Sequence, residues 1–175
     1  MNHTIAAHGK LVHDKQAADY DAIGRVNLAA FGQQAEGDLV DALRSAGFAR
    51  LSLVAELAGE LVGHILFSQI EIVGDGPPVP ALALAPMAVL PERQRQGIGS
   101  ALVRIGLDHC RRAGHDIVLV VGHPGYYPRF GFSADKAAPL QSPYAGEAFM
   151  ALELTPAALQ GITGSVRYSP PFESL

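Results

Sequence analysis

The sequence predicts an α/β or α+β fold in which helices flank a mixed β-sheet. Three observations favour it. Hydrophobic residues make up 49% of the chain and charged residues 17%, which is typical of a folded globular protein. Helix-like and strand-like segments alternate along the chain. Between residues 81 and 121 an apolar strand, a helix and a second apolar strand follow one another, which predicts a parallel, right-handed crossover.

Composition limits the classes of protein that fit. A length of 175 residues predicts one domain over residues 1–175. One cysteine, Cys110, excludes an internal disulfide framework, and its place in an amphipathic helix predicts a buried, inert thiol. The net charge of -4 disfavours an extended nucleic-acid surface. The start of the chain lacks a signal-peptide pattern and no apolar run reaches membrane-spanning length, so we expect a cytoplasmic protein that uses no membrane.

Two helices are predicted first. Over residues 14–31, apolar residues at Ala18, Ala22, Val26, Ala29 and Ala30 indicate one buried stripe, which Gly32 ends. Residues 37–47 predict a shorter helix with Leu39, Val40 and Leu43 facing inward.

Three strands are predicted next. Residues 51–56 and 61–73 form a hairpin, with Gly59 in the turn. The proline-rich residues 74–80 predict a surface loop. Residues 81–90 are apolar on both faces and indicate a central strand, in which Pro86 removes a hydrogen-bond donor and predicts a bulge or a splayed strand.

The second half of the chain predicts a helix, two strands and an extension. The helix covers residues 97–113, with Ile98, Leu102, Ile105 and His109 on one face and Gly114 at its end. Residues 116–121 and 148–154 are strands, separated by a turn-rich aromatic segment. The extension, residues 155–175, is expected to cover the sheet edge or to contact a second subunit in a homodimer.

The segment PERQRQGIGSAL, residues 91–102, predicts a phosphate-binding turn. Gly97 and Gly99 open a helix whose first amides have no intrahelical partner, and Arg93 and Arg95 add positive charge. The P-loop pattern is absent, and Leu102 stands where a dinucleotide fingerprint needs glycine. Capping glycines beside solvated arginines are the alternative interpretation.

Residues 94–99, QRQGIG, instead fit the pattern Q/R-x-x-G-x-G/A after a strand, and YYPRFGF, residues 126–132, forms a second motif. Together these motifs resemble the GNAT superfamily of acyl-CoA N-acyltransferases, in particular a bacterial subgroup of N-acetyltransferases. The resemblance implies a mostly antiparallel sheet with a splayed central pair of parallel strands.

The resemblance also implies where acetyl-CoA, the co-substrate, binds. Its pyrophosphate would lie on Gln94, Arg95, Gln96, Gly97, Ile98, Gly99 and Ser100. Its pantetheine arm would pair with the backbone of Met87, Ala88 and Val89, and an N–H near Met87 and Ala88 would polarise the thioester carbonyl.

Tyr127 occupies the position of the family's general acid, and a phenol can share its proton with a departing thiolate. Tyr126 is the spare candidate, and a packed aromatic cluster is the alternative. His123 is the candidate general base, with His64, Glu71, Glu36 or a chain of water molecules as the alternatives.

The implied activity is transfer of an acetyl group from acetyl-CoA to a primary amine of a small molecule or peptide. The alternatives are a non-catalytic acyl-CoA-binding module and an acetylator of charged tRNA, which the acidic balance disfavours. Glu36, Asp38, Glu71 and Asp75 could attract a cationic amine or could equally be solvated. We expect no metal, because the spacing of His3, His8 and His13 groups them on neither a helix nor a strand, and we expect them to lie in a mobile start.

Overall fold

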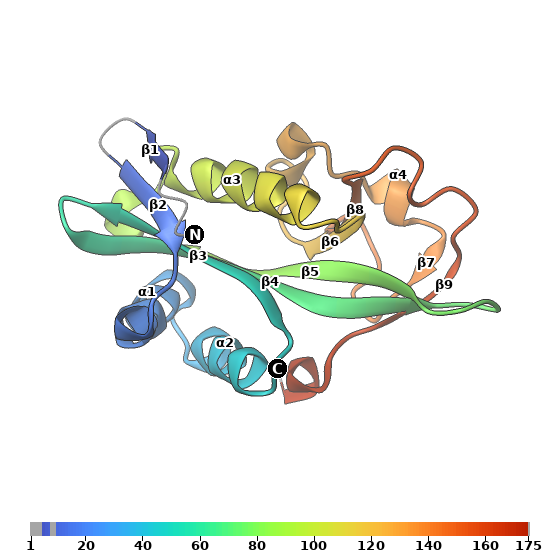
Figure 1. The fold of residues 1–175 in the computed structure, drawn as a ribbon, viewed down its shortest axis with the longest axis horizontal. Coiled ribbons are helices and arrows are strands. Elements are labelled where there is room, and N and C mark those ends of the chain that lie inside the picture. Colours follow the sequence, from blue (N-terminus) through green and yellow to red (C-terminus); the bar gives the residue numbers. More distant parts are fainter. Residues whose placement is uncertain (1–4, 8–9, 175) are drawn as a thin grey trace.

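A nine-stranded mixed sheet forms the centre of the molecule in a computed structural model that describes residues 5–7 and 10–174 (Figure 1). The strand order is β1-β2-β3-β4-β5-β6-β8, while β9 pairs with β4 and β7. On this path only β5 and β6 are parallel, so the predicted fold class is confirmed. The strands are β1 (Ile5–Ala7), β2 (Lys10–Asp14), β3 (Ala49–Leu57), β4 (Glu60–Val73), β5 (Val79–Val89), β6 (Ile117–Val121), β7 (Leu140–Gln141), β8 (Phe149–Glu153) and β9 (Gly164–Arg167).

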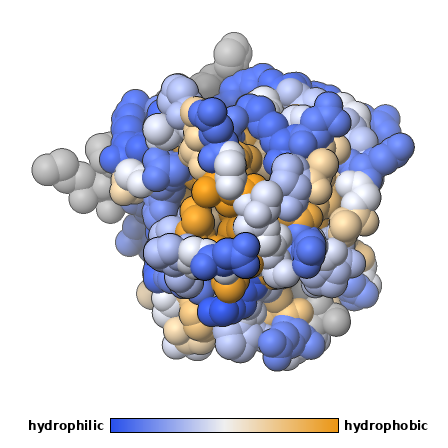
Figure 2. All heavy atoms as spheres, turned by 90° about the vertical axis from the view of Figure 1, so that its right-hand side faces the viewer, coloured by the Kyte–Doolittle hydropathy of each residue, from blue (hydrophilic) through white to orange (hydrophobic). Residues whose placement is uncertain are grey.

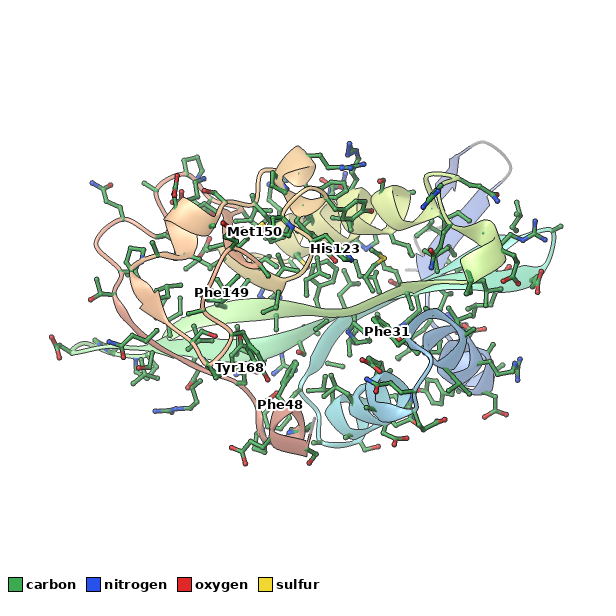
Figure 3. All side chains as sticks on the ribbon, turned by 180° about the vertical axis from the view of Figure 1, so that it is seen from behind. Phe31, Phe48, His123, Phe149, Met150 and Tyr168 are labelled. Atoms are coloured by element: carbon green, nitrogen blue, oxygen red, sulfur yellow. The ribbon has the colours of Figure 1, made fainter. Side chains whose placement is uncertain are left out.

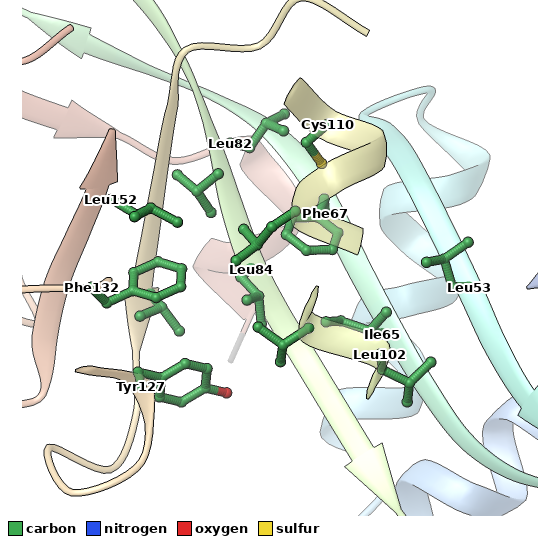
Figure 4. Close-up of a cluster of buried hydrophobic side chains, with 14 of the residues drawn as sticks. Leu53, Ile65, Phe67, Leu82, Leu84, Leu102, Cys110, Tyr127, Phe132 and Leu152 are labelled. Carbon is green, nitrogen blue, oxygen red and sulfur yellow. The ribbon is translucent and has the colours of Figure 1, made fainter. Parts of the chain in front are cut away.

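Helices cover both faces of the sheet. They are α1 (Tyr20–Phe31), α2 (Ala35–Ser45), α3 (Ile98–Arg112) and α4 (Ala134–Ala137), with short 3₁₀ segments η1 (Ala17–Asp19), η2 (Pro91–Arg93), η3 (Tyr127–Phe130) and η4 (Pro170–Ser174). Side chains alternate between the two faces along β4. Ile65 and Phe67 therefore pack in the core under α3, which Figure 4 shows, whereas Leu66 and Ile70 pack in the core under α1 and α2.

The start of the chain differs from the prediction. Asp14 ends β2 and pairs with Leu53 of β3, so the expected helix over residues 14–31 is wrong in its first turns. Helix α1 buries Ile23, Val26 and Asn27, while Ala29 is exposed. The Asp19 carboxylate accepts the Gln16 N–H (2.6 Å), which starts a 3₁₀ turn after the strand.

The histidines at the start are also placed differently from the prediction. His13 belongs to β2 and not to a mobile segment, and its Nε2 lies 3.2 Å from a carboxylate oxygen of Glu56. His3 and His8 lie outside the described residues.

The hairpin and second helix follow the prediction. Gly59 takes a positive φ of 80° in the turn between β3 and β4, and Leu39, Val40 and Leu43 are buried. The expected loop over residues 74–80 is shorter, since Val79 and Pro80 already belong to β5. Pro80 is tolerated there because it lies at the start of its strand.

Helix α3 buries a wider stripe than predicted. Ile98 and Leu102 are buried as expected, but Ile105 and His109 are only half-buried. Val103, Gly106, Leu107 and Cys110 complete the buried face. Burial raises the pKa of the Cys110 thiol to about 12, so it is protonated and unreactive near neutral pH, as predicted.

The end of the chain completes the sheet. Strand β9 pairs with residues 71–73 of β4, which extend beyond the part of β4 that β3 covers. The η4 segment then buries Phe172 in the core under α1 and α2. Seen from the side of the molecule on which β7 and β9 lie, hydrophobic side chains occupy a hollow that hydrophilic side chains border (Figure 2).

A fully buried polar group lies between α1 and the sheet. His64 contacts Ser52 through Nε2 (2.9 Å) and Asn27 through Nδ1 (3.4 Å). Burial, reinforced by the charges of Lys15 and Arg44, lowers the pKa of His64 to about 3. The folded protein therefore holds this imidazole neutral, whereas the unfolded chain takes up a proton below about pH 6.5.

This difference predicts acid destabilisation through His64. Its contribution to stability is complete above about pH 6.5 and is lost as the pH falls towards 3, because the unfolded state binds the proton more tightly. Between pH 7 and pH 5 the wild-type free energy of unfolding should fall by roughly 2 kcal/mol more than that of His64→Gln. Urea denaturation at both pH values measures this; equal losses in the two proteins would contradict it.

The close approach of α3 to the sheet predicts a second stability effect. A Cβ on Gly106 would lie 2.5 Å from Phe67 Cε2, so Gly106→Ala should destabilise the fold by about 1–3 kcal/mol through overpacking. Gly24→Ala in α1 is the matched control, because its Cβ meets no atom within 4 Å and alanine favours the helix by roughly 0.5–1 kcal/mol. Denaturation midpoints that move in the same direction for both variants would argue against this packing.

Candidate active site

A cavity of about 1360 Å³ lies where β5 and β6 separate. The two strands pair only from Leu82 to Leu84 and from Val118 to Val120. Beyond them Pro86 falls in a register shift between β4 and β5, so the predicted bulge is confirmed. Residues 85–89 have no strand partner on the β6 side in the described part of the chain, and this edge of β5 borders the cavity.

The turn after β5 is shaped by two left-handed residues. Arg95 has a φ of 60° and Gly97 a φ of 78°, and α3 begins at the next residue. Gln94 Nε2 donates to the Val89 carbonyl (3.1 Å), and Gln96 Nε2 donates to the Glu92 carbonyl (3.3 Å). The turn is thereby tied to β5 and η2. It presents the unpaired first amides of a 15-residue helix to the cavity, which is an arrangement that binds anions.

Gly99 is a glycine for lack of space. A Cβ there would lie 3.1 Å from Tyr126 Oη and 3.3 Å from Met87 Sδ. Beside it, Ser100 Oγ and Tyr126 Oη lie 3.2 Å apart. The start of α3 therefore meets both β5 and the residue before η3 at this point, and a side chain at position 99 would require the Tyr126 or Met87 side chain to shift.

Tyr127 is packed in the core and also lines the cavity. Its ring lies edge-on to Tyr126 (5.1 Å between centroids) and to Phe132 (5.7 Å), and its hydroxyl points away from Phe132 towards β5 (Figure 4). A Cβ on Gly122 would lie 2.2 Å from Tyr127 Cε2. Burial, then repulsion from Tyr126, raises the pKa of Tyr127 to about 12, so the phenol remains protonated near neutral pH.

His123 lies in the exposed loop after β6, on the α3 side of the sheet (Figure 3). Its side chain borders the cavity, and its carbonyl accepts the N–H of Tyr126 (3.0 Å) and of Tyr127 (3.4 Å). The other candidate bases are placed differently. His64 is enclosed in the core, and Glu71 pairs with Arg167 (3.2 Å), whereas Glu36 lines the cavity.

The cavity brings together most of the residues selected from the sequence. Those that line it are Met87, Ala88, Val89, Gln94, Arg95, Gly97, Ile98, Gly99, Ser100, His123 and Tyr127, whereas Gln96 does not. Three further residues, Arg129, Tyr168 and Phe172, also line the cavity but were not predicted from the sequence. The aromatic residues of the segment RYSPPF, residues 167–172, were the available signal, but its place in the fold depends on the pairing of β9.

No group of three or more His, Cys, Asp or Glu side chains among residues 5–7 and 10–174 is arranged to hold a metal ion. In the same part of the chain, none of the helices has the length and apolar character needed to cross a membrane.

Comparisons with known proteins agree with this geometry. The model of the acetyltransferase (GNAT) family matches residues 20–132. The chain is 37% identical to the N-acetyltransferase YjhQ of Escherichia coli K12, over 97% of this chain and 98% of that protein.

Two solved structures are also similar. The GNAT-family N-acetyltransferase YhbS of Escherichia coli in complex with CoA has a TM-score of 0.88 and 33% identity, covering 98% of this chain and 96% of that one. A GNAT-family acetyltransferase from Brucella melitensis in complex with acetyl-CoA has a TM-score of 0.79 and 37% identity, covering 95% of this chain and 99% of that one. The chain therefore belongs to the GNAT acetyltransferase family and is an acetyl-CoA-dependent acyltransferase.

Proposed function

We propose that this protein transfers the acetyl group of acetyl-CoA to a primary amine of a small molecule or peptide, by direct attack within a ternary complex. The observation that carries the proposal is one continuous cavity. It connects the anion-binding start of α3, the free strand edge at residues 85–89 and the protonated phenol of Tyr127. The CoA and acetyl-CoA complexes of two similar structures support it.

Each part of the cavity has a proposed role in binding acetyl-CoA. The amides of residues 94–100, with Arg93 and Arg95, hold the pyrophosphate. The edge of β5 at Met87, Ala88 and Val89 pairs with the amide groups of the pantetheine arm, as an added strand would. This places the thioester in the split between β5 and β6, beside Tyr127.

The reaction forms a C–N bond and breaks the C–S bond of the thioester. It also moves two protons, one away from the attacking nitrogen and one to the departing sulfur. A backbone N–H of Met87 or Ala88 donates to the carbonyl oxygen and stabilises the negative charge that develops there. The neutral amine forms a bond to the carbonyl carbon, the C–S bond breaks, and the nitrogen gives up a proton to His123 or to water. The sulfur receives a proton from Tyr127, which is later reprotonated from solvent.

The alternative is a module that binds acyl-CoA without catalysis. Both hypotheses require the start of α3, but only an enzyme requires a proton donor beside the thioester. Release of free CoA thiol from acetyl-CoA in a screen of primary amines decides between them. Thiol release with at least one amine supports the enzyme, whereas acetyl-CoA binding without release supports the module.

Placement of the pyrophosphate at Gly99 predicts loss of acetyl-CoA binding in Gly99→Glu. The new side chain would occupy the space beside Tyr126 and Met87 and bring a negative charge to the anion site. Affinity should fall by about tenfold or more. Calorimetric titration with acetyl-CoA measures this. Gly76→Glu is the matched control, with the same charge change in an exposed loop and no atom within 4 Å of its Cβ. Unchanged affinity in a folded Gly99→Glu protein would place the pyrophosphate elsewhere.

Proton donation by Tyr127 predicts a loss of turnover without a loss of binding. With an amine found in the screen, Tyr127→Phe should lower kcat by about 10²-fold, while the Kd for acetyl-CoA stays unchanged. Tyr126→Phe is the matched control and should lower kcat far less. Because the pKa of Tyr127 is about 12, its ionisation should not reduce wild-type activity below roughly pH 11. Equal effects of the two substitutions on kcat would refute this role.

A further inference from the structure

The charged residues around the cavity are divided between the two sides of the sheet. Arg93, Arg95 and Arg129 lie with η2, the start of α3 and η3. Glu36 of α2 is the one acidic residue among the described residues that line the cavity. Helix α3 packs on one face of the sheet and α2 on the other (Figure 1), so the negative charge is on the side away from the phosphate-binding turn.

The Glu36 carboxylate is only partly satisfied. Its Oε1 accepts a hydrogen bond from Gln33 Nε2 (3.1 Å). Its Oε2 is covered from solvent and has no hydrogen-bond partner among the described residues. A covered carboxylate oxygen without a donor is unfavourable, and a bound cation would compensate it.

The other acidic residues that the sequence offered for an amine do not share this position. Asp38 and Asp75 are exposed, and Glu71 is paired with Arg167 on the β4–β9 edge. None of the three lines the cavity. Of these four acidic residues, Glu36 alone lines the cavity.

Aromatic rings form the neighbouring walls. Phe31, at the end of α1, and Tyr144 both line the cavity and are 42% and 39% exposed. Tyr168 stacks edge-on against Tyr144 (5.3 Å between centroids) and contacts Phe172 (5.3 Å). Phe31 and Tyr168 lie on the side of the sheet opposite His123 (Figure 3). Ring faces and a carboxylate both attract organic cations.

From these features we propose that the acceptor carries a second positively charged group, which is not acetylated, and that Glu36 binds this group beside the aromatic wall. The inference rests on the proposed function, since it names a class of acceptor. An amine with a single nitrogen cannot make this contact while that nitrogen, in its neutral form, attacks the thioester.

The cation at Glu36 is distinct from the reacting nitrogen. The nitrogen that attacks must be neutral, whereas a neighbouring carboxylate stabilises the protonated form of an amine. The reacting nitrogen also has to reach the thioester beside Met87 and Ala88, on β5, and Glu36 comes from a different element, α2. The Glu36 side of the cavity thus binds the charged group of the acceptor, while the neutral nitrogen reaches the thioester on the β5 side.

The test uses two matched probes, 1,5-diaminopentane and pentylamine, which differ by one amino group. In thiol release from acetyl-CoA, wild-type protein should use the diamine with a kcat/KM about tenfold higher than that of the monoamine or better, because only the diamine can keep a charge at Glu36 while its other nitrogen attacks. Glu36→Gln, which keeps the shape and removes the charge, should lower kcat/KM for the diamine to that for the monoamine. In calorimetric titration of the protein saturated with CoA, the same substitution should weaken diamine binding by about tenfold. Asp38→Asn is the matched control and should leave both wild-type results intact.

Four results would overturn the inference. In thiol release they are a wild-type protein that does not prefer the diamine, a preference that survives in Glu36→Gln, and an equal loss of kcat/KM for both amines, which would assign Glu36 to the reacting nitrogen. In calorimetry it is diamine binding that Glu36→Gln leaves unchanged. Thermal unfolding of each variant verifies folding. Binding needs no turnover, so failure of the proposed function is seen separately: a protein that binds the diamine through Glu36 but releases no thiol from acetyl-CoA with any amine would refute the enzyme and leave the cation site at Glu36 standing.

Discussion

The short pairing between β5 and β6 is the constraint on which the rest of the site depends. Three residue pairs hold the strands together, from Leu82 with Val118 to Leu84 with Val120. Proline at position 86 has no N–H, and the local register shift turns the next part of β5 away from β6. An opening in the middle of a sheet would normally leave backbone groups unpaired, at a cost in stability. Here that edge borders a cavity, and we propose that the amides of the CoA arm pair with it.

Glycines at the end of the separation between β5 and β6 lower the stability of the fold but leave room for neighbouring side chains. A strand-to-helix junction gains nothing from flexibility, because glycine loses more conformational entropy on folding than other residues. Gly97 is favoured by its left-handed φ, Gly99 leaves room for the Tyr126 and Met87 side chains, and Gly122 is required by the Tyr127 ring. These glycines allow the start of α3 to approach Tyr126 and the residue after β6 to approach Tyr127, so the phosphate-binding turn and the phenol border the same cavity.

The local features that could be predicted from the sequence are those at glycine and proline, because these two residue types have characteristic backbone conformations. Gly97, Gly99 and Pro86 predicted a turn and a bulge at their positions, and the resemblance of the surrounding motifs to the GNAT superfamily implied most of the cavity lining. Strand β2 was missed because its five residues carry no strong periodicity, and its pairing with β3 is formed across about forty residues of chain. Tyr168 and Phe172 reach the cavity only because β9 pairs with β4, which no local pattern encodes.

The raised pKa of Tyr127 refines the role in proton donation that we propose for it. A phenol with a pKa of about 12 is a weaker acid than a free thiol, whose pKa is about 8.5, so full transfer of its proton to sulfur would be unfavourable in water. The burial that weakens this acid also raises the pKa of any thiolate formed beside it, because both anions lose solvation in the same enclosure. The two pKa values therefore move together. The proton is best described as shared in a charge-assisted hydrogen bond that is strong only while the sulfur is negative, and such a bond stabilises the transition state more than the bound thioester.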